Sequence, residues 1–439
     1  MTKGGRAYIP EADTMRFLKS SNQAIAYYSL GHALHTVLIS AFEMAFLLRL
    51  FQSLPVVLEL YMLYYISLFA FFTLGMRLLK TGMAHRGFRL DILCQIITAL
   101  WAFCFFSKLG SLAYLMPYFA FRGASEGFYW SSRHCSVLDS VRDADRDSFF
   151  MRIQSLQIAL AVVLPLGGAF LISLPAALPG IQKPGSPLPP GYAYLFLSSG
   201  LFSMAVLALS PKLTILPQSL RLGRIAAAAR SPKTRLWIRY QTFTATHMLA
   251  AALCGALLNV GILRTEANIG LFASSVALVS ALVFWTVGKA LRGQKTQRMI
   301  WTLAGCAGDA LSRFLYAVFY SYPVLIVKVI MDSFLSPLKA IFGENVVRRK
   351  IEEVRNELSM SSAEGFFFQE AVIFLGRMAL LGAGLAWSSS LGPDGLARSP
   401  VELARAALPF FAIAVLGDYF FLRAINRSME QGRYRKRFP

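Results

Sequence analysis

Charged side chains are scarce in this sequence. Of its 439 residues only 15% are Asp, Glu, Lys or Arg, whereas 56% are hydrophobic, and the mean hydropathy is +0.52. Soluble domains usually carry about 25% charged and 45–50% apolar residues. This shortage of charge excludes an ordinary soluble protein and favours a chain that crosses a membrane many times.

Acidic residues are the scarcer of the two signs. There are 23 Asp and Glu against 44 Lys and Arg, which gives a net charge of +21. In a soluble protein such an excess would indicate nucleic-acid binding. Here the basic residues fall between the apolar runs, as expected of loops on the cytoplasmic side of a membrane. We therefore expect the lipid bilayer, and no nucleic acid, as a partner.

Signals of enzyme chemistry are missing. The sequence has no P-loop and no zinc-type histidine cluster. Five cysteines lie in or beside apolar runs without the spacing of a metal site: Cys94, Cys104, Cys135, Cys254 and Cys306. The N-terminus lacks the apolar core of a signal peptide, so the first apolar run should stay in the membrane. We predict a non-enzyme without metal or cofactor.

Twelve apolar runs are long enough to span a bilayer, which takes roughly 20 residues. Basic residues concentrate before the first run, after every second run and after the last, so both termini are predicted to be cytoplasmic. The protein would be a multi-pass protein of a bacterial inner membrane. The runs cover about residues 24–53, 58–78, 91–107, 109–132, 150–173, 192–210, 237–262, 268–289, 299–319, 321–342, 362–388 and 401–424.

A basic segment, residues 211–236, divides these runs into two sets of six. We predict an N-terminal half (1–210), a cytoplasmic linker (211–236) and a C-terminal half with a basic tail (237–439). Within the linker, LPQSLRLGRIAAAAR could form an amphipathic helix on the inner membrane face. A solvated linker that only satisfies the charge rule is the alternative.

Two six-span halves joined by a basic loop resemble the major facilitator superfamily. Gly75, Lys80 and Gly82 of GMRLLKTG match that family's motif after the second span, but Leu79 stands where the family has Asp. The family's salt bridge from that Asp is therefore in doubt here. The resemblance implies an all-α fold of twelve transmembrane helices, working as a secondary transporter by alternating access.

A narrower resemblance comes from three stretches: FRGASEGFYW, RDADRDSF and EGFFFQEAVIFLGR. They are similar to a bacterial branch of the superfamily that includes the glycolipid flippase of lipoteichoic acid synthesis. The resemblance implies a lipid-linked or amphipathic substrate.

The first of these stretches places charges inside the fourth span, where they are costly and therefore functional candidates. At about 100° per residue, Arg122, Glu126, Tyr129 and Arg133 fall within about 60° of one another, with Trp130 at the edge. The stripe could line a central cavity and bind substrate. Alternatively, Arg122 and Glu126 could pair with each other and Arg133 could simply end the span.

Small residues flank the stripe. Gly123 and Gly127 form a G-x-x-x-G pair, which would let a neighbouring helix approach closely.

Carboxyl groups in other spans are candidate proton carriers. Glu43 has no opposite charge three or four residues away, so it is either a carrier, like Glu126, or a structural hydrogen-bonding group. Glu370 and Arg377 are two helical turns apart and share a face. We predict proton coupling by Glu370 and substrate binding by Arg377.

The remaining charges in the spans have simpler interpretations. Asp309 with Arg313, and Lys328 with Asp332, are predicted to be structural or gating pairs at i,i+4. Asp418 has no evident partner. His32 and His35 lie near the inner end of the first span, where we expect either contact with the aqueous phase or a coupling role.

Together these patterns predict a proton-coupled secondary transporter of an amphipathic or anionic substrate. Arg122 and Arg133 would hold the head group, while Tyr129 and Trp130 would stack on sugar or apolar parts. Two alternatives stay open: an exporter of small drugs or organic anions, and a non-transporting partner that assembles or delivers components of a membrane complex.

Overall fold

The computed structural model describes all residues except 1–10, 142, 175–187, 291–297, 391–398 and 438–439. The described residues contain helices and no strands. Twelve of these helices have 18 residues or more, and each overlaps one predicted run. The first six are α1 (Glu11–Phe51), α2 (Leu54–Leu78), α3 (Ala84–Cys104), α4 (Leu112–Ser140), α5 (Asp143–Ser173) and α6 (Gly191–Ala208). The others are α8 (Arg235–Leu263), α9 (Glu266–Ala290), α10 (Arg298–Val318), α11 (Tyr322–Glu357), α12 (Ser362–Ser390) and α14 (Pro400–Arg437). Helices α1, α4, α11 and α14 extend 8 to 15 residues beyond the predicted bounds.

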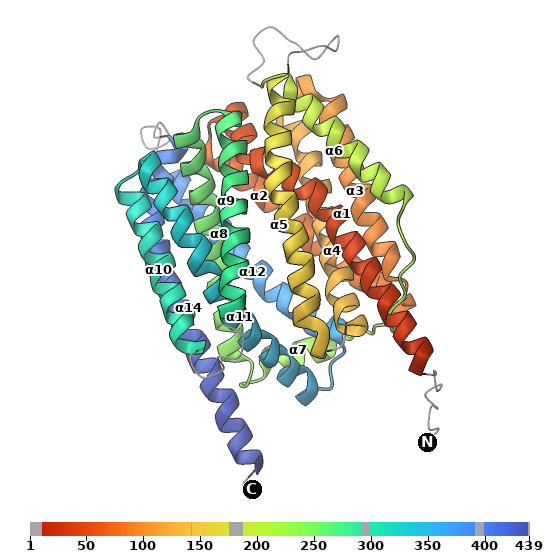
Figure 1. Cartoon of the computed structure of the whole chain (residues 1–439). Helices are drawn as coiled ribbons and strands as arrows, with labels where there is room; N and C mark the ends of the chain where they lie inside the picture. The colour runs from red at the N-terminus through yellow and green to blue at the C-terminus, as the bar shows by residue number, and fades with distance from the viewer. Residues whose placement is uncertain (1–10, 142, 175–187, 291–297, 391–398, 438–439) are drawn as a thin grey trace.

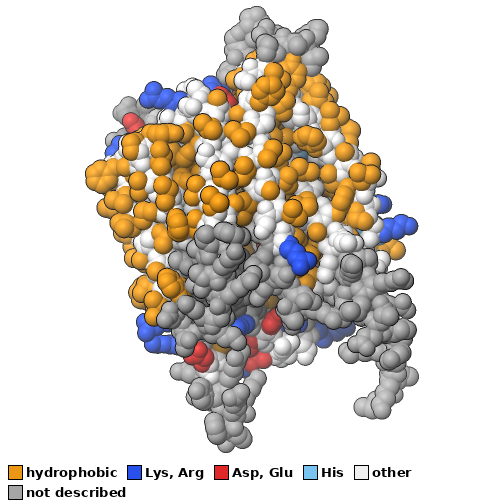
Figure 2. Space-filling model, viewed as in Figure 1, with side chains coloured by type: hydrophobic (Ala, Val, Ile, Leu, Met, Phe, Trp, Pro, Cys, Tyr) orange, Lys and Arg blue, Asp and Glu red, His pale blue; other side chains and the backbone are white. Residues whose placement is uncertain are grey.

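Most of these helices can cross a membrane. Within the described residues, nine are long and apolar enough by length and composition. The other three, α4, α10 and α11, each carry at least two of the charged residues that the sequence places inside spans. Hydrophobic side chains cover the middle of the visible face, and charged ones gather near both ends (Figure 2). The chain is an integral, multi-pass membrane protein.

The helices form two groups that lie side by side (Figure 1). One group is α1–α6, and the other is α8–α12 with α14. The start of α1 and the end of α14 lie at the same end of the bundle, and we call this the basic end; the opposite one is the far end. The groups meet mainly where α2 packs on α12 and α5 on α9. Phe69 of α2, for example, stacks on Phe374 of α12 with ring centroids 4.6 Å apart.

The two glycines beside the charged stripe allow α4 to pack tightly on α2. A Cβ atom at Gly123 would lie 2.2 Å from the carbonyl oxygen of Tyr64, and one at Gly127 would lie 2.5 Å from that of Leu68. Neither distance leaves room for a methyl group. The close approach predicted from the G-x-x-x-G spacing is present, and it fixes the face that α4 turns toward α1 and α3.

The linker ties the two groups together at the basic end. Ile215 N donates to the Gly82 carbonyl (2.8 Å), and Gln218 N donates to that of Leu79 (3.1 Å). On the other group, Arg221 N donates to Glu364 Oε1 (2.8 Å), and Ser361 Oγ donates to the Ser219 carbonyl (2.6 Å). We call residues 213–230 the strap.

The strap ends in the short helix α7 (Leu222–Arg230). Its Ala228 is buried in an apolar cluster with Trp237, Val354 and Phe368. Of the helix predicted over residues 216–230, only residues 222–230 are helical, and this segment packs against the protein. Its contact with the membrane surface stays a prediction, as do the domain boundaries.

Candidate functional site

Arg122 of α4 forms an ion pair with Glu43 of α1. Its Nη1 contacts Glu43 Oε1, and the two side chains are only 12% and 5% exposed. The guanidinium also lies 5.8 Å from the centre of the Tyr64 ring on α2. The alternative in which Arg122 pairs with Glu126 along its own helix is wrong, because the partner comes from α1. Glu43, for which the sequence indicates no partner, is an arginine counterion.

Glu126 lies one turn further along α4 and has different neighbours. Its Oε2 accepts a hydrogen bond from Trp130 Nε1 (2.7 Å) and lies 3.5 Å from His32 Nε2 of α1. Tyr129 is buried, and its ring stacks on that of His32 with centroids 3.6 Å apart and planes within 2°. In this conformation Tyr129 therefore presents no open face, contrary to its predicted role of stacking on substrate.

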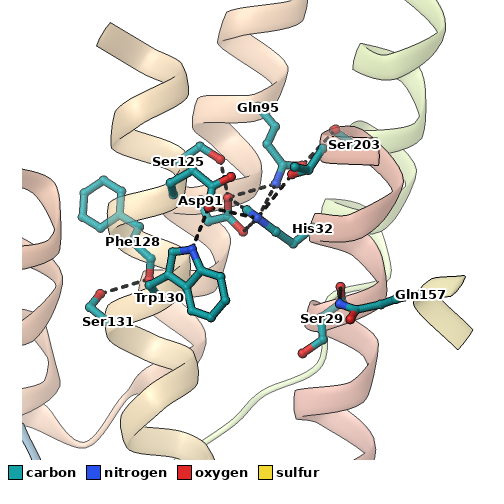
Figure 3. Close-up of polar contacts among 12 residues, drawn as sticks. Ser29, His32, Asp91, Gln95, Ser125, Phe128, Trp130, Ser131, Gln157 and Ser203 are labelled. Carbon is teal, nitrogen blue, oxygen red and sulfur yellow. Dashed lines mark hydrogen bonds and ion pairs between the residues drawn. The ribbon is translucent and has the colours of Figure 1, made fainter. Parts of the chain in front are cut away.

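His32 belongs to a buried polar network that links α1, α3, α4 and α6 (Figure 3). Its Nδ1 is 3.1 Å from Asp91 Oδ2. Asp91 Oδ1 accepts hydrogen bonds from Ser125 Oγ (2.6 Å) and Gln95 Nε2 (2.9 Å), and Ser203 Oγ donates to Gln95 Oε1 (3.2 Å). The expectation that His32 faces the aqueous phase is wrong, since its side chain is 7% exposed.

His35 is buried as well. Its Nδ1 is 2.7 Å from Ser199 Oγ of α6, so it too faces the helix group rather than water. Sequence reasoning missed Asp91 entirely. The signal was present, since FRLDILCQ places an acidic residue one turn into an apolar run, but Asp91 reads equally well as the boundary of the third span.

Arg133 lies three turns from Arg122, toward the basic end. Its guanidinium is 5.0 Å from the Trp130 ring and 5.6 Å from Phe150. The neighbouring His134 stacks on Phe366 of α12, with centroids 4.6 Å apart. This end of the predicted stripe is therefore an aromatic contact between the two helix groups. Its surroundings differ from those of Arg122.

The second helix group supplies a matching arginine. Arg377 Nη1 on α12 donates to Glu370 Oε1 (3.2 Å), as their shared helix face predicts. The Arg377 guanidinium also lies 4.7 Å from the Tyr65 ring of α2. Tyr64 and Tyr65 are in edge contact, with centroids 4.8 Å apart. Two arginine–glutamate pairs, one from each group, thus face adjacent tyrosines of a single helix.

The predicted pairs on α10 and α11 are both present. Arg313 Nε donates to Asp309 Oδ1 and Lys328 Nζ to Asp332 Oδ2, each at 2.5 Å. Ser312 Oγ also donates to Asp332 Oδ1 (2.6 Å), which couples the two helices. This arrangement favours the structural interpretation of these four charges, because each has an intrahelical partner.

Asp418 has two partners, contrary to the sequence interpretation. His247 Nε2 of α8 is 2.9 Å from its Oδ1, and Thr244 Oγ1 donates to the same oxygen (2.8 Å). A search of the described residues finds no group of three or more His, Cys, Asp or Glu side chains suited to hold a metal ion.

No protein-family model and no curated protein sequence matches this chain. Solved structures do match over nearly its whole length. A bacterial homologue of the iron transporter ferroportin, in an inward-facing state, has a TM-score of 0.61 and 14% identity, over 93% of this chain and 98% of that one. A structure from work on proton dependent oligopeptide transporters has a TM-score of 0.65 and 11% identity, over 94% and 100%.

The E.coli fucose:proton symporter matches with a TM-score of 0.59 and 11% identity, over 94% of this chain and 99% of that one. This chain has the fold of these transporters. The predicted class, an all-α membrane protein with the major facilitator fold, is confirmed. Identities this low show the fold alone. The resemblance to the flippase branch stays a prediction, and Arg142 of its RDADRDSF stretch lies outside the described residues.

Proposed function

We propose that this protein is a proton-coupled secondary transporter that moves an amphipathic or anionic substrate across a bacterial inner membrane by alternating access. The observation that carries the proposal is the two arginine–glutamate contacts: Arg122–Glu43, which is largely buried, and Arg377–Glu370, which is partly buried. They come from different helix groups and face the adjacent rings of Tyr64 and Tyr65. In this fold the two groups move against each other around a site between them.

Arginine suits an anionic substrate because its planar guanidinium binds carboxylate or phosphate oxygens through two parallel hydrogen bonds. Here each guanidinium is already bound to a glutamate. An incoming anion would displace that carboxylate, and a buried carboxylate without a partner is strongly unfavourable unless it takes up a proton. Substrate binding at Arg122 or Arg377 is thereby linked to protonation of Glu43 or Glu370.

The apolar part of the substrate would lie on the tyrosines. Besides Tyr64 and Tyr65, α2 contributes Tyr61, whose ring is in edge contact with Phe119 of α4. Aromatic rings with a polar hydroxyl accept both sugar and acyl surfaces. We assign Trp130 and Arg133 to a position nearer the basic end, where the head group would pass when the aromatic contact with α12 opens.

A proton flux measurement tests the proposal. Purified protein in lipid vesicles with an internal pH dye would be exposed to an amphipathic anion (a lysophosphatidylglycerol), a dipeptide or a neutral sugar. We expect alkalinisation or acidification only with the amphipathic anion, and loss of the signal in Arg122→Ala and Arg377→Ala. The matched control is Asp309→Asn with Arg313→Gln, which removes an intrahelical pair and should leave the flux unchanged.

Absence of proton flux with every probe would contradict the proposal. So would a flux in the two arginine variants equal to that of the wild type. Flux with unrelated hydrophobic cations and neutral drugs would instead favour the drug-exporter alternative.

One observation favours a different class of function. Leu79, which stands where the superfamily motif has Asp, is 1% exposed, and its carbonyl accepts a hydrogen bond from the strap. A basic end fastened in this way suits a non-transporting protein that assembles or delivers components of a membrane complex. Stable co-purification with one complex, together with silent vesicles, would support that alternative.

A further inference from the structure

The His32 imidazole lies between two carboxylates from two different helices. Its Nδ1 is 3.1 Å from Asp91 Oδ2 of α3, and its Nε2 is 3.5 Å from Glu126 Oε2 of α4. A neutral imidazole can donate from only one ring nitrogen, whereas the charged ring donates from both. Because acceptor oxygens lie beside both ring nitrogens, the surroundings of His32 fit a ring that is protonated on both.

The other groups around His32 fit this assignment. Thr36 Oγ1 is 3.2 Å from Nε2 and offers a further oxygen on that side. On the Asp91 side, Gln95 Nε2 lies 3.1 Å from Nδ1 but also donates to Asp91 Oδ1. Tyr129 covers one face of the ring. The nearby charged or titratable groups on α1 and α4 are His35, Arg122 and, further along α1, Glu43, which is paired with Arg122.

Histidines elsewhere in the bundle provide a contrast. His247 lies at a comparable position in α8, the first helix of the second group, and is equally buried. It meets a carboxylate at Nε2 only, since its Nδ1 has no hydrogen-bond partner. His35 meets a hydroxyl, not a carboxylate. Of these three buried histidines, only His32 has a carboxylate on both sides of its ring.

We propose that His32, Asp91 and Glu126 form a proton-binding site that is separate from the two arginine–glutamate pairs. This inference rests on the proposed function and deepens it, because it divides the work between two sites. Glu43 and Glu370 are the counterions that an anionic substrate displaces. A further proton, distinct from the one that Glu43 or Glu370 takes up on displacement, is held on the imidazole between the two carboxylates and drives transport.

Release of the proton follows from the same geometry. The Nε2–H proton passes to Glu126 Oε2, which leaves a neutral imidazole and a neutral carboxyl group. The charge attraction between α1 and α4 at this point is then lost, while the Nδ1–H contact keeps α1 on α3. His32 and Glu43 are 11 residues apart on α1, or about 16 Å at 1.5 Å per residue, and lie on the same face. Movement of α1 at His32 therefore reaches the Glu43–Arg122 pair directly.

Nitrogen NMR of the protein in lipid vesicles tests the site without any substrate. With ring-¹⁵N-labelled histidine at about pH 7.5, where a free imidazole is mostly neutral, the two protonation states give distinct ¹⁵N shifts. The chain has 5 histidines, so the spectrum is assignable by single substitutions. We expect one ring with both nitrogens protonated, and complete loss of that signal in His32→Gln.

Two further variants keep the test decisive. Glu126→Gln preserves the size of the side chain and should convert the doubly protonated signal to that of a neutral ring. His247→Gln is the matched control and should remove a different signal only. A neutral-ring signal for His32 in the wild type, or an unchanged charged signal in Glu126→Gln, would overturn the proposal.

The outcome is separable from that of the proposed function. If the charged His32 signal is present but no probe moves protons, the site stands and the transport proposal fails. If flux occurs but the His32 ring is neutral, transport stands and this site is wrong. If both hold, His32→Gln should abolish uptake driven by a pH gradient while exchange at equal pH on both sides continues.

Discussion

Arg49 of α1 and Glu266 at the start of α9 join the two helix groups at the far end through two hydrogen bonds. Arg49 Nε donates to Oε1 (2.5 Å) and Nη2 donates to Oε2 (2.8 Å). Tyr192 of α6 adds a third hydrogen bond to Glu266 Oε1 (3.2 Å). In the structure Arg49 closes the far end.

Removing this contact should favour opening at the far end. The Arg49 side chain is 36% exposed, so we expect a modest effect of about 0.5–1 kcal/mol, or a two- to fivefold shift in population. Spin labels at Ser111→Cys and Ala267→Cys, with Cys104→Ser, would report the distance in Arg49→Gln. Exchanging the two charges, Arg49→Glu with Glu266→Arg, should restore the closed distance. An unchanged distance distribution in Arg49→Gln would show that the contact does not hold the end.

Substitution of Gly82 should loosen the strap. Its φ of +71° is left-handed, and an added Cβ would lie 2.6 Å from the Ile215 carbonyl oxygen. The backbone penalty alone is about 1–2 kcal/mol. Gly82→Ala should therefore speed amide hydrogen exchange of residues 213–218 by about tenfold or more. Gly223→Ala, which has no atom within 4 Å of the new Cβ, is the control. Equal exchange in both variants would argue against a fastened strap.

Substitution of Gly127 should destabilise the first helix group. A methyl group there would meet backbone atoms of α2, at 2.5 Å from Leu68 O and 2.6 Å from Phe72 N, which cannot move aside cheaply. Overpacking of this kind costs about 1–3 kcal/mol. We expect a lower melting temperature for Gly127→Ala in detergent. Gly167→Ala on α5 meets no atom within 4 Å and should melt at or above the wild-type temperature, because alanine is the better helix former.

Attachment of the strap should depend on pH through Asp139. This residue lies on α4 beyond the predicted span, and Gln218 Nε2 of the strap donates to its Oδ2 (2.7 Å). Burial raises the pKa of the Asp139 carboxyl to about 6. Because the folded pKa is above the unfolded one, the attached state gains stability as the pH falls through about 6 and loses it as the carboxylate charges.

The change in stability falls between the unfolded and the folded pKa of the Asp139 carboxyl. Amide hydrogen exchange of the strap at about pH 5 and about pH 7, corrected for the intrinsic exchange rates, would measure it. Asp139→Asn should remove it, since the amide carries no proton to titrate. A wild-type strap with equal protection at both pH values would exclude Asp139 as the titrating group.

The sequence was sufficient for the fold because the signals that determine it are local. Runs of apolar residues place α1–α6, α8–α12 and α14, even where only Ser321 and Pro323 mark the turn between α10 and α11. Spacing also identifies contacts within one helix, such as Arg313 with Asp309 and Arg377 with Glu370, because residues on the same face are set by the helical repeat.

Contacts between helices could not be predicted in the same way. Arg122 has Glu126 four residues away and Glu43 79 residues away, and only the packing of α1 on α4 selects the second. The same holds for Asp418, whose partner His247 comes from α8. Asp91 was missed because hydropathy treats an acidic residue near the start of a run as its boundary. Rotation of each helix about its axis decides these cases, and tertiary packing sets that rotation.

The strap has a consequence for the rate of any opening at the basic end. Neighbouring residues of the strap bond to different helix groups: Ile215 and Gln218 donate to Gly82 and Leu79 on one side, and Arg221 donates to Glu364 on the other. The groups therefore cannot part there as rigid bodies until one set of bonds has dissociated. Detachment of one side of the strap must therefore precede any separation of the two groups at the basic end, and the rate of detachment limits the rate of that separation.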